Sequence, residues 1–375
     1  CRVPARAEVY TSISKRVSTA FRYQKCKMRR ILWFRRDLRV KDNPLLSLGG
    51  EVLPIFIFDT NILSSLEKND KRVSFIFFYV QKLKQQLKEL GLDLKVFYGK
   101  PLDVFEYLIE KDFDEVVASG DYDAYAKQRD LEISHKIHFR YIQDTYIFKH
   151  KEVLKDNGST YLVFTPFYKK ARKILDSKNI KELPLQKHTL VDEEYERIMH
   201  IDEKLELLSS SFELHSIGFE EVALTIIDPY EKLRTFTTNI NSYKEKRDFL
   251  ESDVGSNLSV DLRFGTMSIR EILRVLFENS HLDIEPFIRQ LIFRDFYAYL
   301  LFHFSPIENE NYKYSFNGIE NKPMFKTFCE AKTGFPIVDA GVRELLKTGS
   351  MHNRVRMVVA SFFTKDLLLP WQWGE

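Results

Sequence analysis

Apolar, strand-like runs alternate with amphipathic helical stretches along the first part of this chain, and that alternation limits its fold more than any other feature. The strand-like runs are residues 31–34, 52–58, 94–98, 115–118 and 141–148. Apolar residues recur at helical spacing in 74–90 and 102–109 between them. The pattern predicts an α/β domain over residues 28–155, a doubly wound, Rossmann-like parallel sheet.

Ligands of such a sheet bind beyond the carboxyl ends of its strands. The turn after the first run, FRRDLRVKDNP, has neither form of glycine-rich phosphate loop, which argues against an ordinary dinucleotide or triphosphate site. Asp121, Tyr122 and Asp123 follow a later run and would stand at the same edge. They have two interpretations, a ligand site or a solvated loop that leads into a helix.

Residues 226–375 read as helical, after a polar interdomain linker at 156–225. Ser268 and Glu271 have capping-box spacing, which predicts a helix start at that point. The helix that begins at Pro286 has one stripe with polar side chains among apolar ones. The stripe consists of Phe287, Gln290, Leu291, Arg294 and Ala298.

A second polar stripe lies near the end of the chain. Asn353 and Arg356 share a face there with Met357 and Ala360, and Arg354 points about a quarter turn away. Guanidinium forks suit carboxylates and phosphates, and the loop 255–259 adds hydroxyls and backbone N–H groups. Two interpretations stay open, a phosphorylated cofactor held between helices or a helical core with internal salt bridges.

Charge and composition narrow the classes of partner. The formal net charge is +3, but residues 1–27 hold seven basic residues and one acid, so the rest of the chain is at −3. Binding to nucleic acid must therefore depend on a local basic patch. The three cysteines form neither a disulfide framework nor a metal cluster, and no apolar run is long enough to span a membrane. We expect a monomeric cytoplasmic protein without a metal.

Residues 1–27 have no helical or alternating apolar period. We interpret them as an unstructured or non-native leader before Met28. An organellar transit peptide is the alternative, because the segment is rich in Arg and Ser and poor in acids.

Several motifs together resemble the DNA photolyase/cryptochrome family. They are ILWFRRDLRVKDNPLL, VFTPFYKKAR, GSNLSVDLRFGTMSIREI, FIRQLIFRDFY and TGFPIVDAGVRELLKTGSMHNRVRMVVASFFTKDLL. The MHNRVRM form is most similar to the class I cyclobutane pyrimidine dimer photolyases. The resemblance covers 28–375 and implies an antenna domain, a linker and an all-α domain that binds FAD. It also implies light-driven electron transfer from reduced FAD to a pyrimidine dimer that is flipped out of damaged DNA.

The resemblance also implies a role for individual residues. For FAD it implies Tyr243, Gly255, Ser256, Asn257, Leu258, Ser259, Phe287, Gln290, Arg294, Asn353 and Arg356. For DNA it implies Arg247, Phe293, Arg354 and Met357. Asn353 would act in catalysis, and Trp371 would carry electrons, as the one match to three tryptophans of the family.

The resemblance also implies a second, antenna chromophore of the folate or deazaflavin type. The sequence does not indicate which of the two it would be. The match ends inside the helical domain at Glu375, so we expect a C-terminally truncated member of the family. The alternatives to dimer repair are a cryptochrome-like blue-light photoreceptor without repair and an inactive fragment that does not retain flavin.

Overall fold

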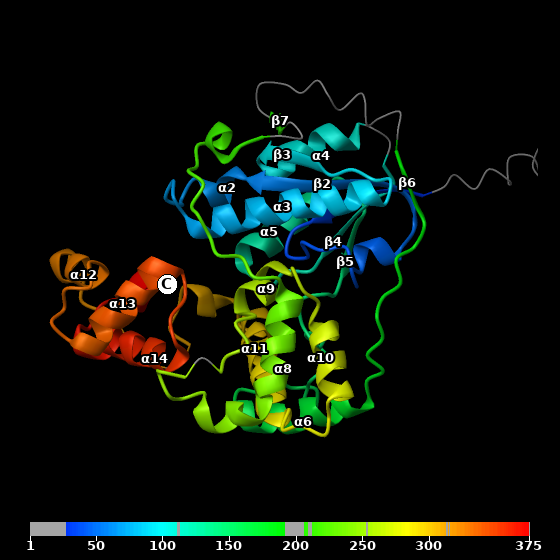
Figure 1. Ribbon diagram of the computed structural model, residues 1–375. Helices are drawn as coiled ribbons and strands as arrows, with labels where there is room; N and C mark the ends of the chain where they lie inside the picture. The colour runs from blue at the N-terminus through cyan, green and yellow to red at the C-terminus, as the bar shows by residue number, and fades with distance from the viewer. Residues whose placement is uncertain are drawn as a thin grey trace, which may run out of the picture.

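The computed structural model describes residues 28–110, 113–191, 206–208, 212–252, 254–312, 314 and 316–374 (Figure 1). The predicted leader 1–27 lies outside the described residues. The strands are β1 (Arg29–Phe34), β2 (Gly50–Asp59), β3 (Lys95–Gly99), β4 (Glu115–Ser119), β5 (Phe139–Ile142), β6 (His188–Leu190) and β7 (Glu206–Leu208). The helices of the first half are α2 (Thr60–Leu63), α3 (Lys71–Glu89), α4 (Pro101–Ile109) and α5 (Ala124–Ser134), with a 3-10 turn at Leu45–Ser47.

The strands form one sheet in the order β5-β4-β1-β2-β3-β7, and β6 pairs with β2. All pairs are parallel except β3 with β7. Successive residues of β1 alternate between the two faces, since Leu32 and Phe34 pack on one side and Ile31 and Trp33 on the other. Helix α3 covers the first face, and α4 and α5 cover the second. The predicted doubly wound sheet is confirmed.

The second half is helical, as predicted for residues 226–375, and it also includes a helix at Phe164–Ser177, from the segment predicted as a linker. Its helices are α6 (Phe164–Ser177), α8 (Pro229–Lys246), α9 (Ser259–Phe264), α10 (Ile269–Glu278), α11 (Glu285–His303), α12 (Lys322–Cys329), α13 (Pro336–Thr348) and α14 (Asn353–Ser361). A π-helical turn follows at Phe362–Asp366, and 3-10 turns lie at Leu214–Ile217, Ser305–Glu308 and Trp371–Gly374. Helices α6, α8, α9, α10 and α11 share one hydrophobic core.

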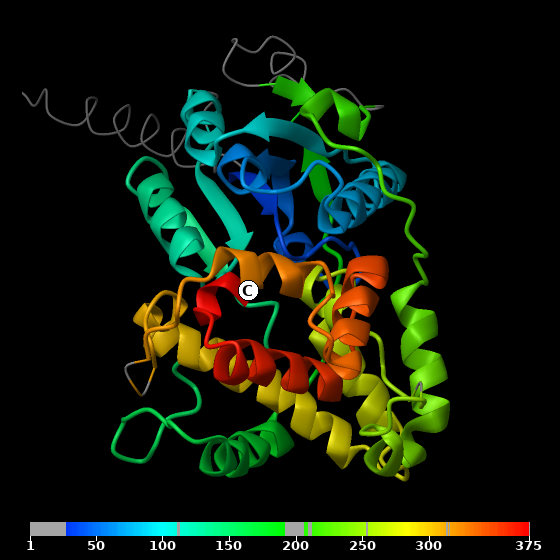
Figure 2. The same cartoon turned by 90° about the vertical axis from the view of Figure 1, so that its left-hand side faces the viewer.

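Helices α12, α13 and α14 form a group of their own, to one side of α8 (Figures 1 and 2). A separate cluster holds this group together, and it includes Val338, Val342, Val355 and Val359. Gly341 on α13 permits close packing, because a Cβ there would lie 2.5 Å from a methyl carbon of Val355. The helical half therefore has two cores, and the predicted cofactor residues are distributed between them.

The strand predicted at 141–148 is wrong beyond Ile142. After that residue the chain turns toward the helical half. The Phe148 N–H donates to Asp295 of α11, and the Thr145 carbonyl accepts from Arg294 of the same helix. Apolar content alone does not distinguish a strand from a segment whose backbone N–H and C=O groups form hydrogen bonds with side chains of another domain.

The capping box is half present. Ser268 is the N-cap of α10, and its Oγ accepts from the Arg270 N–H at 3.1 Å. Glu271 turns outward instead, and its carboxylate pairs with Lys41 of the α/β half at 2.9 Å and with Arg274. A contact between the two halves of the molecule has replaced the local bond.

Candidate functional site

The first part of the predicted flavin site is an aromatic wall between α8 and α11. The rings of Tyr243 and Phe287 are 5.8 Å apart, and Phe236 contacts both. Leu258 belongs to the same core, so the loop 255–259 is anchored beside the wall. Asn257 in that loop has a left-handed backbone, with φ of 53°. Four of the predicted flavin residues, Tyr243, Asn257, Leu258 and Phe287, therefore lie close together in the structure.

Arg294 is held by neutral groups. Its guanidinium donates to the carbonyl oxygens of Thr145 at 2.7 Å and Leu262 at 3.0 Å, and it lies 4.6 Å from the Tyr146 ring. This arrangement joins α11 to α9 and to the α/β half. These partners are backbone carbonyls and not the internal acid that the sequence left open, and the predicted contact of Arg294 with a cofactor anion stays a prediction.

The second part of the predicted site lies on α14. Asn353, Arg354, Arg356 and Met357 are all exposed on its first two turns. The Met357 sulfur lies 3.9 Å from the Asn353 amide nitrogen and 4.0 Å from Arg354 Nη1. The predicted lesion-side residues Asn353, Arg354 and Met357 are thus brought together.

A groove of about 680 Å³ opens along α13 and α14. Its lining is mainly apolar, and Arg354, Lys365 and Asp366 are the charged side chains in it. The residues that line it are Phe335, Ile337, Val338, Arg354, Met357, Val358, Ser361, Phe362, Lys365 and Asp366. Large apolar side chains remain exposed there, with Phe335 at 55% and Met357 at 55%. Such a surface is typical of a binding site.

Phe293 and Trp371 lie away from this groove. The Phe293 ring packs against Phe164 of α6 at 4.0 Å, tilted by 46°. Trp371 donates from Nε1 to the Asn311 side chain at 3.0 Å. Their predicted roles, stacking on a lesion and electron transfer, remain predictions.

At the carboxyl edge of the sheet, charged side chains are paired with one another. Arg36 contacts Asp121 at 2.6 Å and Asp123 at 3.1 Å, and Asp123 also caps α5. Tyr122 stacks on Tyr146 at 5.0 Å and 15°. The Asp-Tyr-Asp motif therefore joins the sheet to the residues around Arg294, where the sequence suggested a ligand site or a solvated loop.

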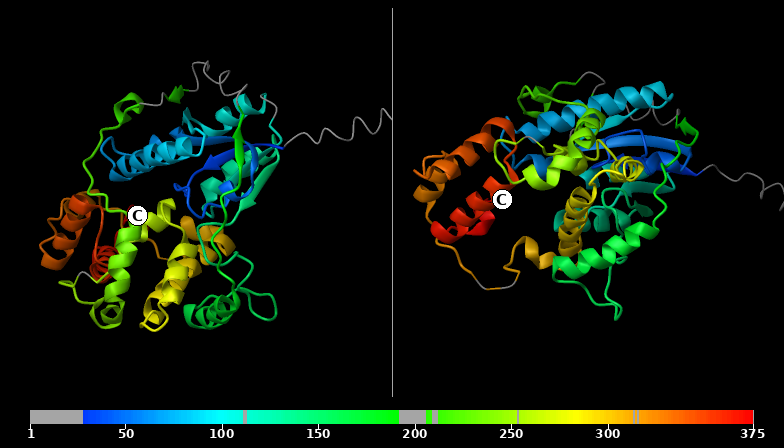
Figure 3. Two further views of the ribbon diagram at one scale, coloured as in Figure 1. Left: turned by 45° about the vertical axis from the view of Figure 1, so that its right-hand side comes forward. Right: turned by 60° about the horizontal axis from the view of Figure 1, so that its bottom comes forward.

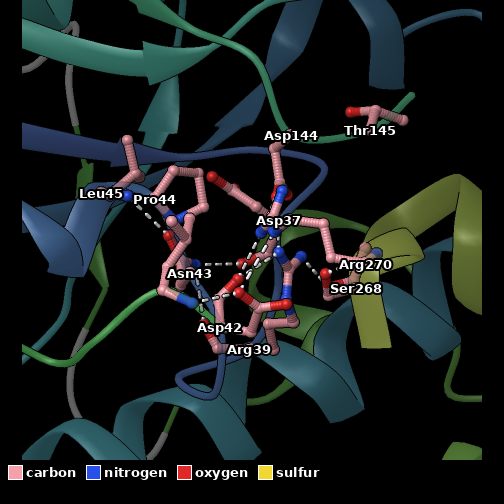
Figure 4. Close-up of polar contacts among 12 residues, drawn as sticks. Asp37, Arg39, Asp42, Asn43, Pro44, Leu45, Asp144, Thr145, Ser268 and Arg270 are labelled. Atoms are coloured by element: carbon pink, nitrogen blue, oxygen red, sulfur yellow. Dashed lines mark hydrogen bonds and ion pairs between the residues drawn. The ribbon is translucent and has the colours of Figure 1, made fainter. Parts of the chain in front are cut away.

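A buried charge network, which the sequence reading missed, joins the two halves (Figure 4). Arg39 is 4% exposed and donates to Asp144 at 2.6 Å and to the carbonyl of Gly265 at 2.9 Å. Arg270 of α10 reaches both Asp144 and Asp42. Gly265 has φ of +65°, and a Cβ there would lie 1.9 Å from a backbone oxygen of Arg36. Both halves thus meet in close backbone contact, with the charges between them paired.

Comparison with known proteins places this arrangement in a family. The DNA photolyase family model matches residues 30–187, and the model for the FAD binding domain of DNA photolyase matches residues 287–375. A deoxyribodipyrimidine photo-lyase from Alkalihalophilus pseudofirmus is 32% identical in an alignment 371 residues long that covers 92% of this chain and 74% of that protein. The chain belongs to the DNA photolyase family. The Synechococcus deoxyribodipyrimidine photo-lyase is 29% identical, over 92% of this chain and 76% of that protein.

Solved structures agree with the family fold. A class III photolyase from Agrobacterium tumefaciens has a TM-score of 0.74 at 25% identity, over 92% of this chain and 74% of that one. A Sulfolobus tokodaii photolyase, solved with two FAD molecules, has a TM-score of 0.75 at 26% identity and covers 92% and 77% of the two chains. A Synechocystis cryptochrome shares the fold alone, at 20% identity and a TM-score of 0.75.

The donor chemistry of the predicted flavin residues fits FAD. Arg356 on α14 and Gln290 on α11 have no hydrogen bond or ion pair to another side chain within the part of the chain that the structure describes, and Arg356 is exposed. A guanidinium and an amide that are free to donate match the phosphates and polar ring edges of such a cofactor. The rings of Tyr243 and Phe287 supply an apolar wall.

Neither a metal cluster nor a helix that could span a membrane is found among the described residues. No group of three or more His, Cys, Asp or Glu side chains there is arranged to hold a metal ion. No helix in the same ranges is both long and apolar enough to cross a membrane.

Proposed function

We propose that this photolyase-family chain repairs cyclobutane pyrimidine dimers in DNA, using light and reduced FAD. The observation that carries the proposal is the grouping of Asn353, Arg354 and Met357 on α14, where Arg354 and Met357 also line an apolar groove. Relatives that share 29–32% of their residues with the chain are named deoxyribodipyrimidine photo-lyases, which supports the same activity.

The chain's own residues would bind and orient both partners. Arg354 and Arg247 are exposed or half-buried cations that can contact the DNA backbone, and such contacts fix position and supply affinity. The apolar groove offers a surface for bases removed from the stack. Arg356, Gln290 and the hydroxyls of Ser256 and Ser259 would hold FAD, which supplies the transferred electron when it is bound and excited by light. A second chromophore remains part of the proposal, without an assigned site.

A flavin-content measurement tests the cofactor part. We expect Arg356→Ala to lose most of the FAD that the parent chain retains, because its guanidinium is the uncommitted cation of α14. Arg234→Ala is the matched control, since Arg234 is an exposed arginine on α8 outside the predicted set. Equal FAD content in both variants would refute the assignment of Arg356.

A repair assay tests the reaction. Light-dependent loss of thymine dimers from an oligonucleotide is expected with the FAD-loaded chain. Bound flavin without repair would favour the alternative of a cryptochrome-like photoreceptor, and absence of bound flavin would favour the inactive fragment.

A further inference from the structure

Asp248 lies between the two arginines that the family resemblance assigns to DNA. Its Oδ1 is 2.7 Å from Arg354 Nη2 and 4.0 Å from Arg247 Nε. Arg247 is the C-cap of α8, whereas Arg354 stands in the first turn of α14, so the two cations approach the same oxygen from different parts of the fold. One carboxylate oxygen is therefore in close contact with Arg354 and at the outer limit of an ion pair with Arg247.

The position of this oxygen has the properties of a phosphate position. Two guanidinium groups around one anionic oxygen are the arrangement by which proteins bind phosphate. The side chains of Arg247, Asp248 and Arg354 are 35%, 50% and 46% exposed, so an external anion can reach them. The hydrogen bond from Arg354 lowers the pKa of Asp248, which therefore stays charged at neutral pH.

We propose that Asp248 is an internal competitor of DNA: in the free protein it occupies the phosphate position between Arg247 and Arg354. A backbone phosphate must displace it to reach Arg354. The inference rests on the proposed function, because it takes DNA as the external anion.

The competition should be weak enough to reverse. Ion pairs this exposed contribute little, because water and salt screen them. The pair also connects two structural groups, since α8 and α14 belong to different hydrophobic cores. Displacing the carboxylate would therefore free α14 from this contact with the residues that follow α8 when DNA binds.

The experiment compares two substitutions that change the net charge equally. Asp248→Asn removes the competing charge. Glu245→Gln removes a charge from the last turn of α8, where the side chain is exposed and outside the arginine contacts. Affinity for a short duplex, with and without one thymine dimer, is measured by fluorescence anisotropy at fixed ionic strength. We expect Asp248→Asn to tighten binding by about three- to tenfold and Glu245→Gln by less than about twofold.

A double-mutant cycle locates the effect. In an Arg354→Ala background, the gain from Asp248→Asn should fall to that of Glu245→Gln, because the carboxylate then has little to compete for. Equal gains from the two single variants would overturn the proposal, and so would a gain from Asp248→Asn that persists without Arg354. Asp248 lies on the surface just past the end of α8, so the folded state of each variant can be checked by circular dichroism.

A second ligand keeps the two proposals separable. Inorganic pyrophosphate is titrated into the same variants by calorimetry. If no variant binds DNA, the proposed function fails, and tighter pyrophosphate binding by Asp248→Asn than by Glu245→Gln still supports an anion position held by Asp248. Equal pyrophosphate binding in that case would overturn the inference as well.

Discussion

Replacing Asp295 with Asn should change how the stability of the protein depends on pH. Asp295 lies on α11 and is 4% exposed. Its Oδ2 accepts from the Phe148 N–H at 3.0 Å, whereas Oδ1 is buried without a hydrogen-bond partner among the described residues. Burial raises the pKa of this carboxyl to about 7, although Arg294, the backbone of 147–148 and Lys178 act in the opposite direction.

The sign follows from the two pKa values. Between the ordinary pKa of 3.8 and about 7, the folded state keeps the proton and the unfolded state releases it. Stability therefore falls as pH rises through that window. A difference of roughly three pH units corresponds to about 4 kcal/mol by pH 8, an upper value for one side chain. Asn does not ionise, so Asp295→Asn should remove this loss.

Urea unfolding from pH 5 to pH 8 measures the effect. The parent chain should lose stability more steeply than Asp295→Asn from pH 5 to about pH 7, and the difference between them should level off above pH 7, once the folded state has also released the proton. Burial and the nearby Asp144 also raise the pKa of Asp37 to about 6, so a smaller loss of stability of the same sign should remain in Asp295→Asn. Asp283→Asn on the surface is the control. Parallel stability curves for the parent and Asp295→Asn would refute the reasoning.

Two other predictions concern contacts between parts of the molecule. Arg39→Met should lower the free energy of unfolding by about 3–5 kcal/mol in urea titrations, because it removes one guanidinium partner of the buried Asp144 carboxylate. Arg234→Met at the surface is the control, and an equally small loss of stability in both variants would contradict this prediction. Lys71 Nζ donates to the carbonyls of Leu346 and Lys347 at 2.6 Å, so Lys71→Met should speed amide exchange at the end of α13, whereas unchanged exchange would show that the contact does not hold that end.

The regular elements could be predicted because each depends on burial along its own length. The four runs at 31–34, 52–58, 94–98 and 115–118 became β1 to β4, since their apolar residues meet helices on both faces of the sheet. The helix that begins near Pro286 followed from its 3.6-residue period. Helical periodicity alone also places Asn353 and Arg356 on one face of a helix.

Partners distant in sequence explain what was missed. Glu271 fits a capping box, but Lys41 lies 230 residues away and accounts for its actual contact. Arg294 needed acceptors, and the carbonyls of Thr145 and Leu262 provide them. Asp248 directly follows Arg247, and this acid beside a predicted DNA-binding arginine was a signal that the sequence offered. Its meaning required the approach of Arg354 from α14.

The division of the site between two cores has a consequence for ligand binding. Tyr243 and Phe287 are fixed in one core, whereas Arg356 is carried by the other. The helices of the two cores, α8 of the first and α12–α14 of the second, stand side by side (Figure 3). Two contacts connect the α12–α14 group to the rest of the protein, that of Lys71 with α13 and that of Arg354 with Asp248. Both contacts are polar and solvent-accessible. A cofactor that touches both groups would therefore add contacts where the protein has weak ones. Because it binds the assembled arrangement, its affinity would contribute directly to the stability of that arrangement.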